Sequence, residues 1–157
     1  MLSRALLIVV GTHAALVSPP THAQSFGDWT VGAGQGWIEY RVENGPGNSF
    51  MIACDEAYSG GQKKTHISVS IRDKSPPAES SAKLFVDGKE FWMGVDAKQE
   101  LSTDCRACDA NFDAIWQNLR TGRTLLVLLA DGRTPSFSLK GAGRALPKKP
   151  CKTAFAS

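Results

Sequence analysis

The chain has 157 residues and carries 18 Lys and Arg against 15 Asp and Glu, a formal net charge of +3 at pH 7. This near balance argues against bulk electrostatic binding to nucleic acid. The length suits one domain with one hydrophobic core.

The first 23 residues follow the plan of a secretory signal peptide. Arg4 precedes an apolar run, Ala5–Val17, that is too short to span a bilayer. Thr21 and Ala23 stand at small-residue cleavage positions. We therefore expect cleavage after Ala23, a periplasmic or secreted protein, and a single β-rich domain over residues 24–157. No later stretch is apolar enough to predict a membrane span.

The first half of this domain reads as strands separated by turns. The strand candidates are residues 27–31, 36–42, 49–54 and 65–72. In the last of these, Ile67 and Val69 alternate with His66 and Ser68, the period of two that a half-buried strand shows. The glycine-rich "VGAGQGW" precedes a strand and not a helix, so it predicts a flexible or bulged connection instead of a phosphate loop.

Two hairpins and one helix are predicted in the second half. Asp87-Gly88 and Asp131-Gly132 each lie between apolar runs, and Asp-Gly suits a type I′ turn. Between the hairpins, one apolar stripe follows helical spacing: Phe112, Ile115, Trp116 and Leu119. Asp109 or Asn111 is expected to cap the start of this helix and Gly122 to end it.

These elements predict a mainly β fold, with about eight strands and one helix. We expect an antiparallel β-sandwich or barrel-like domain, stapled by disulfides, with the amphipathic helix packed across one side.

Cysteines are the residues most suggestive of chemistry. An even number in a small exported domain, Cys54, Cys105, Cys108 and Cys151, predicts disulfides. Three pairings are open; proximity favours Cys105–Cys108, which leaves Cys54–Cys151. The long bridge would stabilise the fold by roughly 4–5 kcal/mol.

A redox role for the Cys-x-x-Cys pair is the competing interpretation, because helix N-terminal amides favour a thiolate. Thr134-Pro135 resembles a step that accompanies such sites. Against this role, no βαβ unit precedes the pair, Arg106-Ala107 matches no known oxidoreductase pattern, and we expect the cysteines to precede the helix instead of opening it.

Other chemistry has less support. A second Cys-x-x-Cys, which structural zinc sites usually have, is absent from the sequence. His66 is the sole histidine after the signal peptide, and its strand position indicates an exposed side chain. No pair of carboxylates stands out. We therefore predict no catalytic residue, no cofactor and no metal ligand, and hence no enzyme.

Candidate interaction residues lie at three places. Phe91 and Trp92 are adjacent in a strand and must face opposite sides, so Trp92 is a candidate surface aromatic. The predicted loop 58–64 offers a second group, Tyr58, Lys63 and Lys64. Acidic residues are absent after Asp131, which leaves a basic C-terminal end with Lys148 and Lys149. We expect a solvated tail there, with weak contact to an anionic surface as the alternative.

Several short segments together are similar to the invasion-associated locus B family of exported bacterial proteins: "FGDWTV", "LFVDGKEF", "TDCRACDANF", "IWQNLRTGRTLLV" and "FSLKGAGRAL". The resemblance implies a periplasmic or surface-associated β protein of Gram-negative bacteria. It also implies a link with host interaction and virulence, without known catalysis.

Three functions follow as hypotheses. The first is a non-enzymatic binding protein of the bacterial envelope with an envelope or host protein as its partner. The second is a periplasmic inhibitor or immunity protein that blocks a cell-wall enzyme through loop 58–64. The third is a thiol-disulfide enzyme.

Overall fold

The computed structural model describes residues 23–55 and 65–155, whose strands form two antiparallel sheets. One sheet has the order β1-β2-β3-β4-β5, and its strands are β1 Gln24–Phe26, β2 Trp29–Gly34, β3 Trp37–Glu43, β4 Ser49–Asp55 and β5 His66–Ser70. The other has the order β7-β6-β8-β9, made of β6 Ser81–Val86, β7 Lys89–Gly94, β8 Thr124–Leu129 and β9 Ser136–Ser138. Two helices complete the fold, α1 (Arg106–Thr121) and α2 (Ala142–Ala145).

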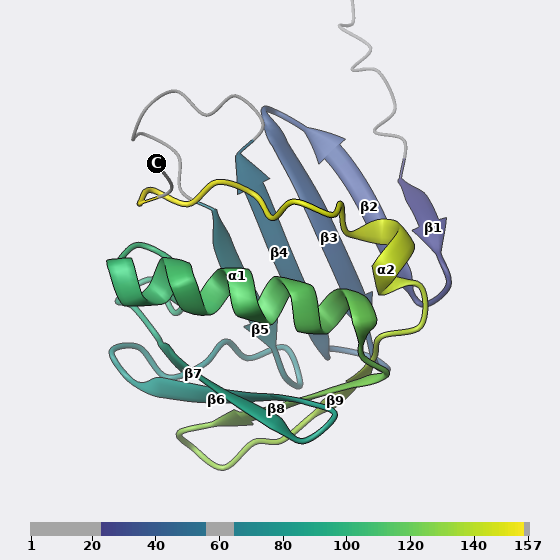
Figure 1. Ribbon diagram of the computed structural model, residues 1–157. Coiled ribbons are helices and arrows are strands. Elements are labelled where there is room, and N and C mark those ends of the chain that lie inside the picture. The colour runs from purple at the N-terminus through teal and green to yellow at the C-terminus, as the bar shows by residue number, and fades with distance from the viewer. Residues whose placement is uncertain (1–22, 56–64, 156–157) are drawn as a thin grey trace, which may run out of the picture.

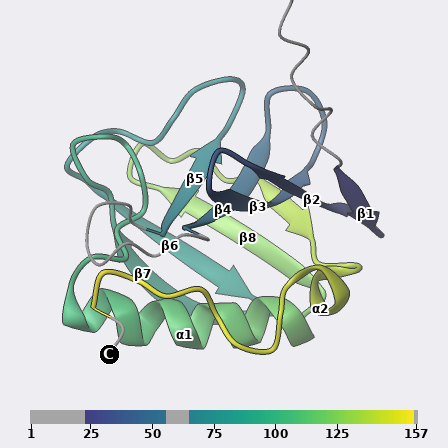
Figure 2. The ribbon, with the colours of Figure 1, turned by 90° about the horizontal axis from the view of Figure 1, so that it is seen from above.

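The predicted fold class is confirmed: the chain is mainly β with one main helix, and the described sheets do not close into a barrel. Figure 1 shows α1 crossing in front of the five-stranded sheet, with the four-stranded sheet below the helix. Figure 2 shows the same elements from above. The signal peptide expected up to residue 23 and the loop expected at 58–64 fall almost wholly outside the described residues.

One core joins the two sheets and the helix. The rings of Tyr40 on β3 and Trp116 on α1 meet edge to face at 5.5 Å, and Phe50 on β4 lies 6.2 Å from Phe137 on β9. The predicted helical stripe is fully buried, as its spacing requires: Phe112, Ile115, Trp116 and Leu119. The helix therefore contributes its whole apolar face to the core.

Helix α1 begins earlier than expected, and the prediction of a cap at Asp109 or Asn111 was wrong. Cys105 is the N-cap residue, and its Sγ accepts a hydrogen bond from the Cys108 N–H at 3.0 Å. The prediction that the cysteine pair precedes the helix was therefore also wrong. Gly122 ends the helix as predicted, and a Cβ there would come within 2.6 Å of Val86 Cγ1.

The glycine-rich segment before β3 forms a tight hairpin instead of the expected flexible or bulged connection. β2 runs on to Gly34, which pairs with Trp37, so only Gln35 and Gly36 remain in the turn. Their φ values of 52° and 81° are the positive values that a two-residue turn needs. The five-stranded sheet therefore continues through this segment.

The two Asp-Gly hairpins differ. Asp87 and Gly88 both have positive φ and join β6 to β7 directly, as predicted. In the second, only Gly132 has positive φ, and β8 ends at Leu129 while β9 starts at Ser136, so the type I′ prediction was wrong. Asp131 instead accepts hydrogen bonds from the backbone and guanidinium of Arg133.

Arg133 explains this longer connection. Its guanidinium bonds the Asp131 carboxylate and also donates to the backbone oxygens of Ile71, Lys74 and Ser75 across the molecule. The hydrogen bond from Arg133 holds the pKa of Asp131 below its ordinary value. The connection between β8 and β9 is thus shaped by a long-range polar contact that the local sequence does not predict.

The basic C-terminal end is not the solvated tail that we expected. Its backbone runs alongside α1: Trp116 Nε1 donates to Pro147 O at 2.8 Å, and Gln117 Nε2 to Lys148 O at 3.0 Å. Figures 1 and 2 both show this segment running along the helix. We call residues 147–155 the C-terminal strap.

Candidate functional site

An apolar patch occupies the outer face of the four-stranded sheet. Buried and more exposed residues alternate along these strands, so the residues between the buried ones point away from the core. Cross-strand register places Phe85 opposite Leu126, and Lys83 opposite both Trp92 and Leu128. We define the outer patch as four side chains: Phe85, Trp92, Leu126 and Leu128.

Trp92 is the most exposed member of the outer patch. It is 57% exposed and Leu126 is 38% exposed, whereas Phe85 and Leu128 are half-buried. Phe91, its neighbour in the chain, is buried at 5%. The sequence prediction that these two aromatics face opposite sides is therefore confirmed, and Trp92 is the outward one.

Charged neighbours hold the Trp92 ring in place. Lys83 Nζ lies 4.1 Å from the ring centroid, within the range of a cation–π contact. The indole N–H donates to the Glu90 carboxylate, which also pairs with Lys83 at 3.6 Å. The ring is therefore oriented before any partner arrives, which reduces the entropy lost on binding.

A shallow depression connects the outer patch with the start of α1. It has a volume of about 540 Å³. Its lining comes from β7, from the segment after it and from the first turns of α1: Trp92, Met93, Gly94, Ser102, Ala107, Cys108, Ala110 and Asn111. Asn111 Nδ2 donates to the Trp92 carbonyl and so joins the helix to this edge strand. Trp92 thus belongs to the outer patch and also lines the depression.

The four cysteines form two disulfides, in the pairing that proximity favoured. Cys105 and Cys108 are joined at the start of α1 with a Cα–Cα distance of 4.9 Å. Cys54 on β4 is joined to Cys151 of the C-terminal strap, with a Cα–Cα distance of 5.6 Å. Cys105 is exposed and Cys108 half-buried, whereas Cys54 is buried.

The strap is held by more than its disulfide. Thr65 Oγ1 donates to Lys152 O at 2.7 Å, and the buried Thr153 donates its hydroxyl to Asp109. Lys148 and Lys149 remain exposed on this strap, as predicted for the basic end. Tyr58, Lys63 and Lys64, the other predicted contact residues, lie outside the described residues.

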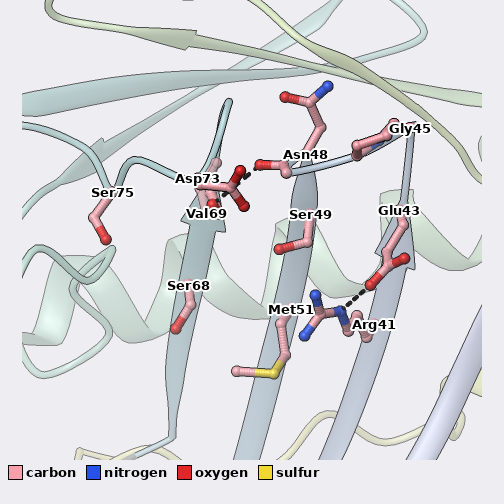
Figure 3. Close-up of a pocket in the computed structure, with 13 residues that line it drawn as sticks. Arg41, Glu43, Gly45, Asn48, Ser49, Met51, Ser68, Val69, Asp73 and Ser75 are labelled. Carbon is pink, nitrogen blue, oxygen red and sulfur yellow. Dashed lines mark hydrogen bonds and ion pairs between the residues drawn. The ribbon is translucent and has the colours of Figure 1, made fainter.

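A larger hollow lies elsewhere, on the outer face of the five-stranded sheet. It has a volume of about 640 Å³, and Figure 3 shows side chains of three strands around it. Arg41 and Glu43 form an ion pair at 2.7 Å, and Ser49 and Ser68 contribute hydroxyls. Asp73 adds one further carboxylate, and the lining contains no histidine or cysteine, so this hollow offers little chemistry.

His66 is half-buried, not exposed as predicted. Its Nε2 lies 3.5 Å from a Glu100 carboxylate oxygen, and its ring centroid lies 5.2 Å from that of Trp37. Thr134 and Pro135 line a separate hollow with Asp131, so they do not accompany the cysteine pair. Within residues 23–55 and 65–155, no group of three metal-ligating side chains comes together.

Sequence reasoning found Trp92 but missed the other members of the outer patch. The run "TLLVLL" looks uniformly apolar, so it gives no sign that Leu126 and Leu128 face outward. The signal lay in the register: in an antiparallel pair, residues opposite Lys83 and Phe85 must share their face. In the part of the chain that the structure describes, no helix has the length and apolar character needed to cross a membrane.

Comparison with known proteins gives one match. A family model described as YfjT matches residues 27–146. No curated protein and no solved structure matches the chain.

Proposed function

We propose that this chain, which belongs to the YfjT family, is an exported, non-enzymatic binding protein of the bacterial envelope. The observation that carries the proposal is the outer patch, in which an oriented and exposed Trp92 shares one face of the sheet with three aliphatic or aromatic side chains. Contiguous exposed apolar surface marks sites of interaction with other proteins.

The composition of the patch suits a protein partner. Tryptophan is enriched among the residues that dominate binding energy, and such residues are surrounded by contacts that exclude water. Half-buried Phe85 and Leu128 offer that surrounding surface, and Lys83 and Glu90 supply a polar rim. An envelope or host protein with a complementary apolar surface is the expected partner.

Export is supported by the signal-like first 23 residues and by the disulfides, since disulfides persist in oxidising compartments. The resemblance to the invasion-associated locus B family supports an envelope location and a role in host interaction or virulence.

The exposed Lys148 and Lys149 support a secondary, weak contact with an anionic surface. No contact among the described residues favours the inhibitor alternative, which depended on loop 58–64.

The test is a binding experiment with matched variants. Residues 24–157 serve as bait for envelope extract, and the recovered protein is then titrated against the Trp92→Ala variant and a Phe155→Ala control. Phe155 is 52% exposed but lies outside the outer patch, so it matches Trp92 in exposure alone. We expect Trp92→Ala to weaken binding by roughly 30-fold or more, as hot-spot residues do.

The control is expected to bind as the unchanged chain does. Equal binding by Trp92→Ala, Leu126→Ala and Phe155→Ala, all with unchanged circular dichroism, would refute the outer patch as the contact surface. Stoichiometric recovery of a cell-wall hydrolase, together with loss of its activity, would favour the inhibitor instead.

A further inference from the structure

The two disulfides differ in what they constrain. Cys54–Cys151 spans a separation of 97 residues and ties the C-terminal strap to an inner strand, whereas Cys105–Cys108 spans a separation of three. A cross-link stabilises a fold mainly in proportion to the logarithm of the loop that it closes. The short bridge therefore restrains much less of the unfolded chain than the long bridge does. Restraint of the unfolded chain gives little reason for a bridge at this position.

Capping does not supply that reason. The Sγ of Cys105 accepts the Cys108 N–H as an N-cap acceptor does, but Ser, Thr, Asp and Asn are the residues preferred for that task. A cap needs one acceptor and no second cysteine three residues later. The pair of sulfurs thus exceeds what the start of the helix requires.

The position of Cys105 favours its release as a thiolate. A sulfur at an N-cap lies where unpaired amides and the helix dipole stabilise negative charge, and here the Cys108 N–H already points at it from 3.0 Å. Stabilising the reduced form makes a disulfide a stronger oxidant. The same geometry gives no comparable support to Cys54, which lies near the end of β4 and not at a helix terminus.

Access to the bridge is open, and it lies beside a binding surface. Cys105 is exposed, and Cys108 lines the depression that Trp92 borders. The depression is also lined by Ala107, Ala110 and Gly94, so an extended segment of another protein can approach Cys108, whose disulfide partner Cys105 is exposed. Exposed disulfides are the labile or catalytic ones, whereas buried ones resist reduction.

We propose that Cys105–Cys108 is a thiol-disulfide exchange site that oxidises protein dithiols. A substrate thiolate attacks the exposed Cys105 Sγ and forms a mixed disulfide, while the Cys105–Cys108 bond breaks and its electron pair leaves on Cys108 Sγ. The second substrate thiol, deprotonated, then attacks the substrate sulfur of the mixed disulfide. The substrate disulfide forms, and Cys105 leaves as a thiolate that accepts the Cys108 N–H.

Two electrons thus pass from the substrate dithiol to the cysteine pair. The substrate thiols lose their two protons to solvent, and Cys108 Sγ takes up one proton from solvent while Cys105 stays a thiolate. This activity runs against the expectation of no enzyme, one ground for which was that the cysteine pair precedes the helix, whereas Cys105 caps α1. It does not depend on the proposed binding function, because a small thiol can reach the exposed Cys105 without contacting the outer patch. A failure of binding through Trp92 and a failure of exchange at Cys105 are therefore separate results.

The first experiment compares the two bridges in one protein. The oxidised chain, residues 24–157, is equilibrated with increasing reduced glutathione, quenched with acid, alkylated and mapped by peptide mass spectrometry. We expect Cys105 and Cys108 to be alkylated at glutathione concentrations roughly 100-fold lower than those that release Cys54 and Cys151. Circular dichroism should show an unchanged fold at that point.

The second experiment identifies the exchanging sulfur. Cys108→Ser and Cys105→Ser each leave one free thiol where Cys54–Cys151 has formed, and peptide mapping first selects the preparations with that bridge. Both variants are then reacted with oxidised glutathione at pH 7. We expect Cys105 of the Cys108→Ser variant to form the mixed disulfide about 10-fold faster than Cys108 does in the other variant.

Two results would overturn the proposal. One is co-reduction of both bridges, or reduction of Cys105–Cys108 only where the protein unfolds. The other is an equal or faster reaction at Cys108. A last readout is direct: the oxidised chain should convert a reduced dithiol peptide to its disulfide stoichiometrically, and the Cys105→Ser/Cys108→Ser variant should not.

Discussion

Removal of the Cys54–Cys151 bridge should cost far more stability than removal of the Cys105–Cys108 bridge. The first closes a loop with a separation of 97 residues, for which the chain-entropy relation gives about 4.7 kcal/mol. The second has a separation of three, for which the same relation gives about 2 kcal/mol. The difference arises in the unfolded chain, since both folded ends are held by other contacts.

The perturbation is the double variant Cys54→Ala/Cys151→Ala, with Cys105→Ala/Cys108→Ala as its matched control. For a domain of this length, a loss of about 4.7 kcal/mol lowers the melting temperature by roughly 15–20 °C. The control should fall by less than half of that. Urea unfolding followed by tryptophan fluorescence supplies the free energies.

The m-value provides an independent check on the cause. Without the long bridge the unfolded chain expands and exposes more surface, so the m-value should rise in the first variant and stay nearly constant in the control. Equal losses of stability in the two variants, or an unchanged m-value in the first, would refute the chain-entropy reasoning. The stabilisation would then come from contacts of the strap in the folded state.

Three further outcomes are expected. Gly141→Ala should destabilise the fold by at least ~3 kcal/mol in urea unfolding, because its φ is 96° and a Cβ would lie 1.8 Å from Phe26 O. The control Gly88→Ala, where φ is 87° and no atom lies near the added Cβ, should lose only about 1 kcal/mol. Trp116→Ala should lower the free energy of unfolding by about 3–5 kcal/mol, because it leaves a cavity at a fully buried site. A loss below about 1 kcal/mol, the size expected of a surface substitution, would contradict this packing. Asp131→Asn should be less stable than the unchanged chain at neutral pH, and the gap should close as pH falls through the depressed pKa of Asp131, because its ionised form favours the folded state; a gap in melting temperature that is independent of pH would contradict this.

The sequence correctly predicted the strands, the helix and the turn whose signal lies in residues close together in the chain. The alternation in "THISVSIR" and the stripe from Phe112 to Leu119 both placed the correct residues in the core, because a single buried face imposes its period on the sequence. Asp87-Gly88 fixed its turn for a similar reason, since the positive φ values are a property of two neighbouring residues.

Features set by distant contacts were predicted poorly. The start of α1 was misplaced because the capping acceptor is a sulfur and not one of the usual oxygens. The connection after Asp131 depends on Arg133 reaching the backbone of residues 71–75, and the strap depends on Trp116 and Cys54, far away in the chain. The same holds for the outer patch, whose apolar members are adjacent only once the strands are in register.

The separation between Cys54 and Cys151 also fixes an order of events during biosynthesis. A chain is made from its N-terminus, so Cys54, Cys105 and Cys108 all become available before Cys151 exists. Cys105 and Cys108 are three residues apart and can pair at once, whereas Cys54 must wait until Cys151, 97 residues later, has been made. Early formation of the short bridge removes the two thiols with which Cys54 could mispair. The short bridge thereby keeps Cys54 from mispairing until Cys151 has been made. Replacing Cys108 would expose the nascent chain to a Cys54–Cys105 cross-link.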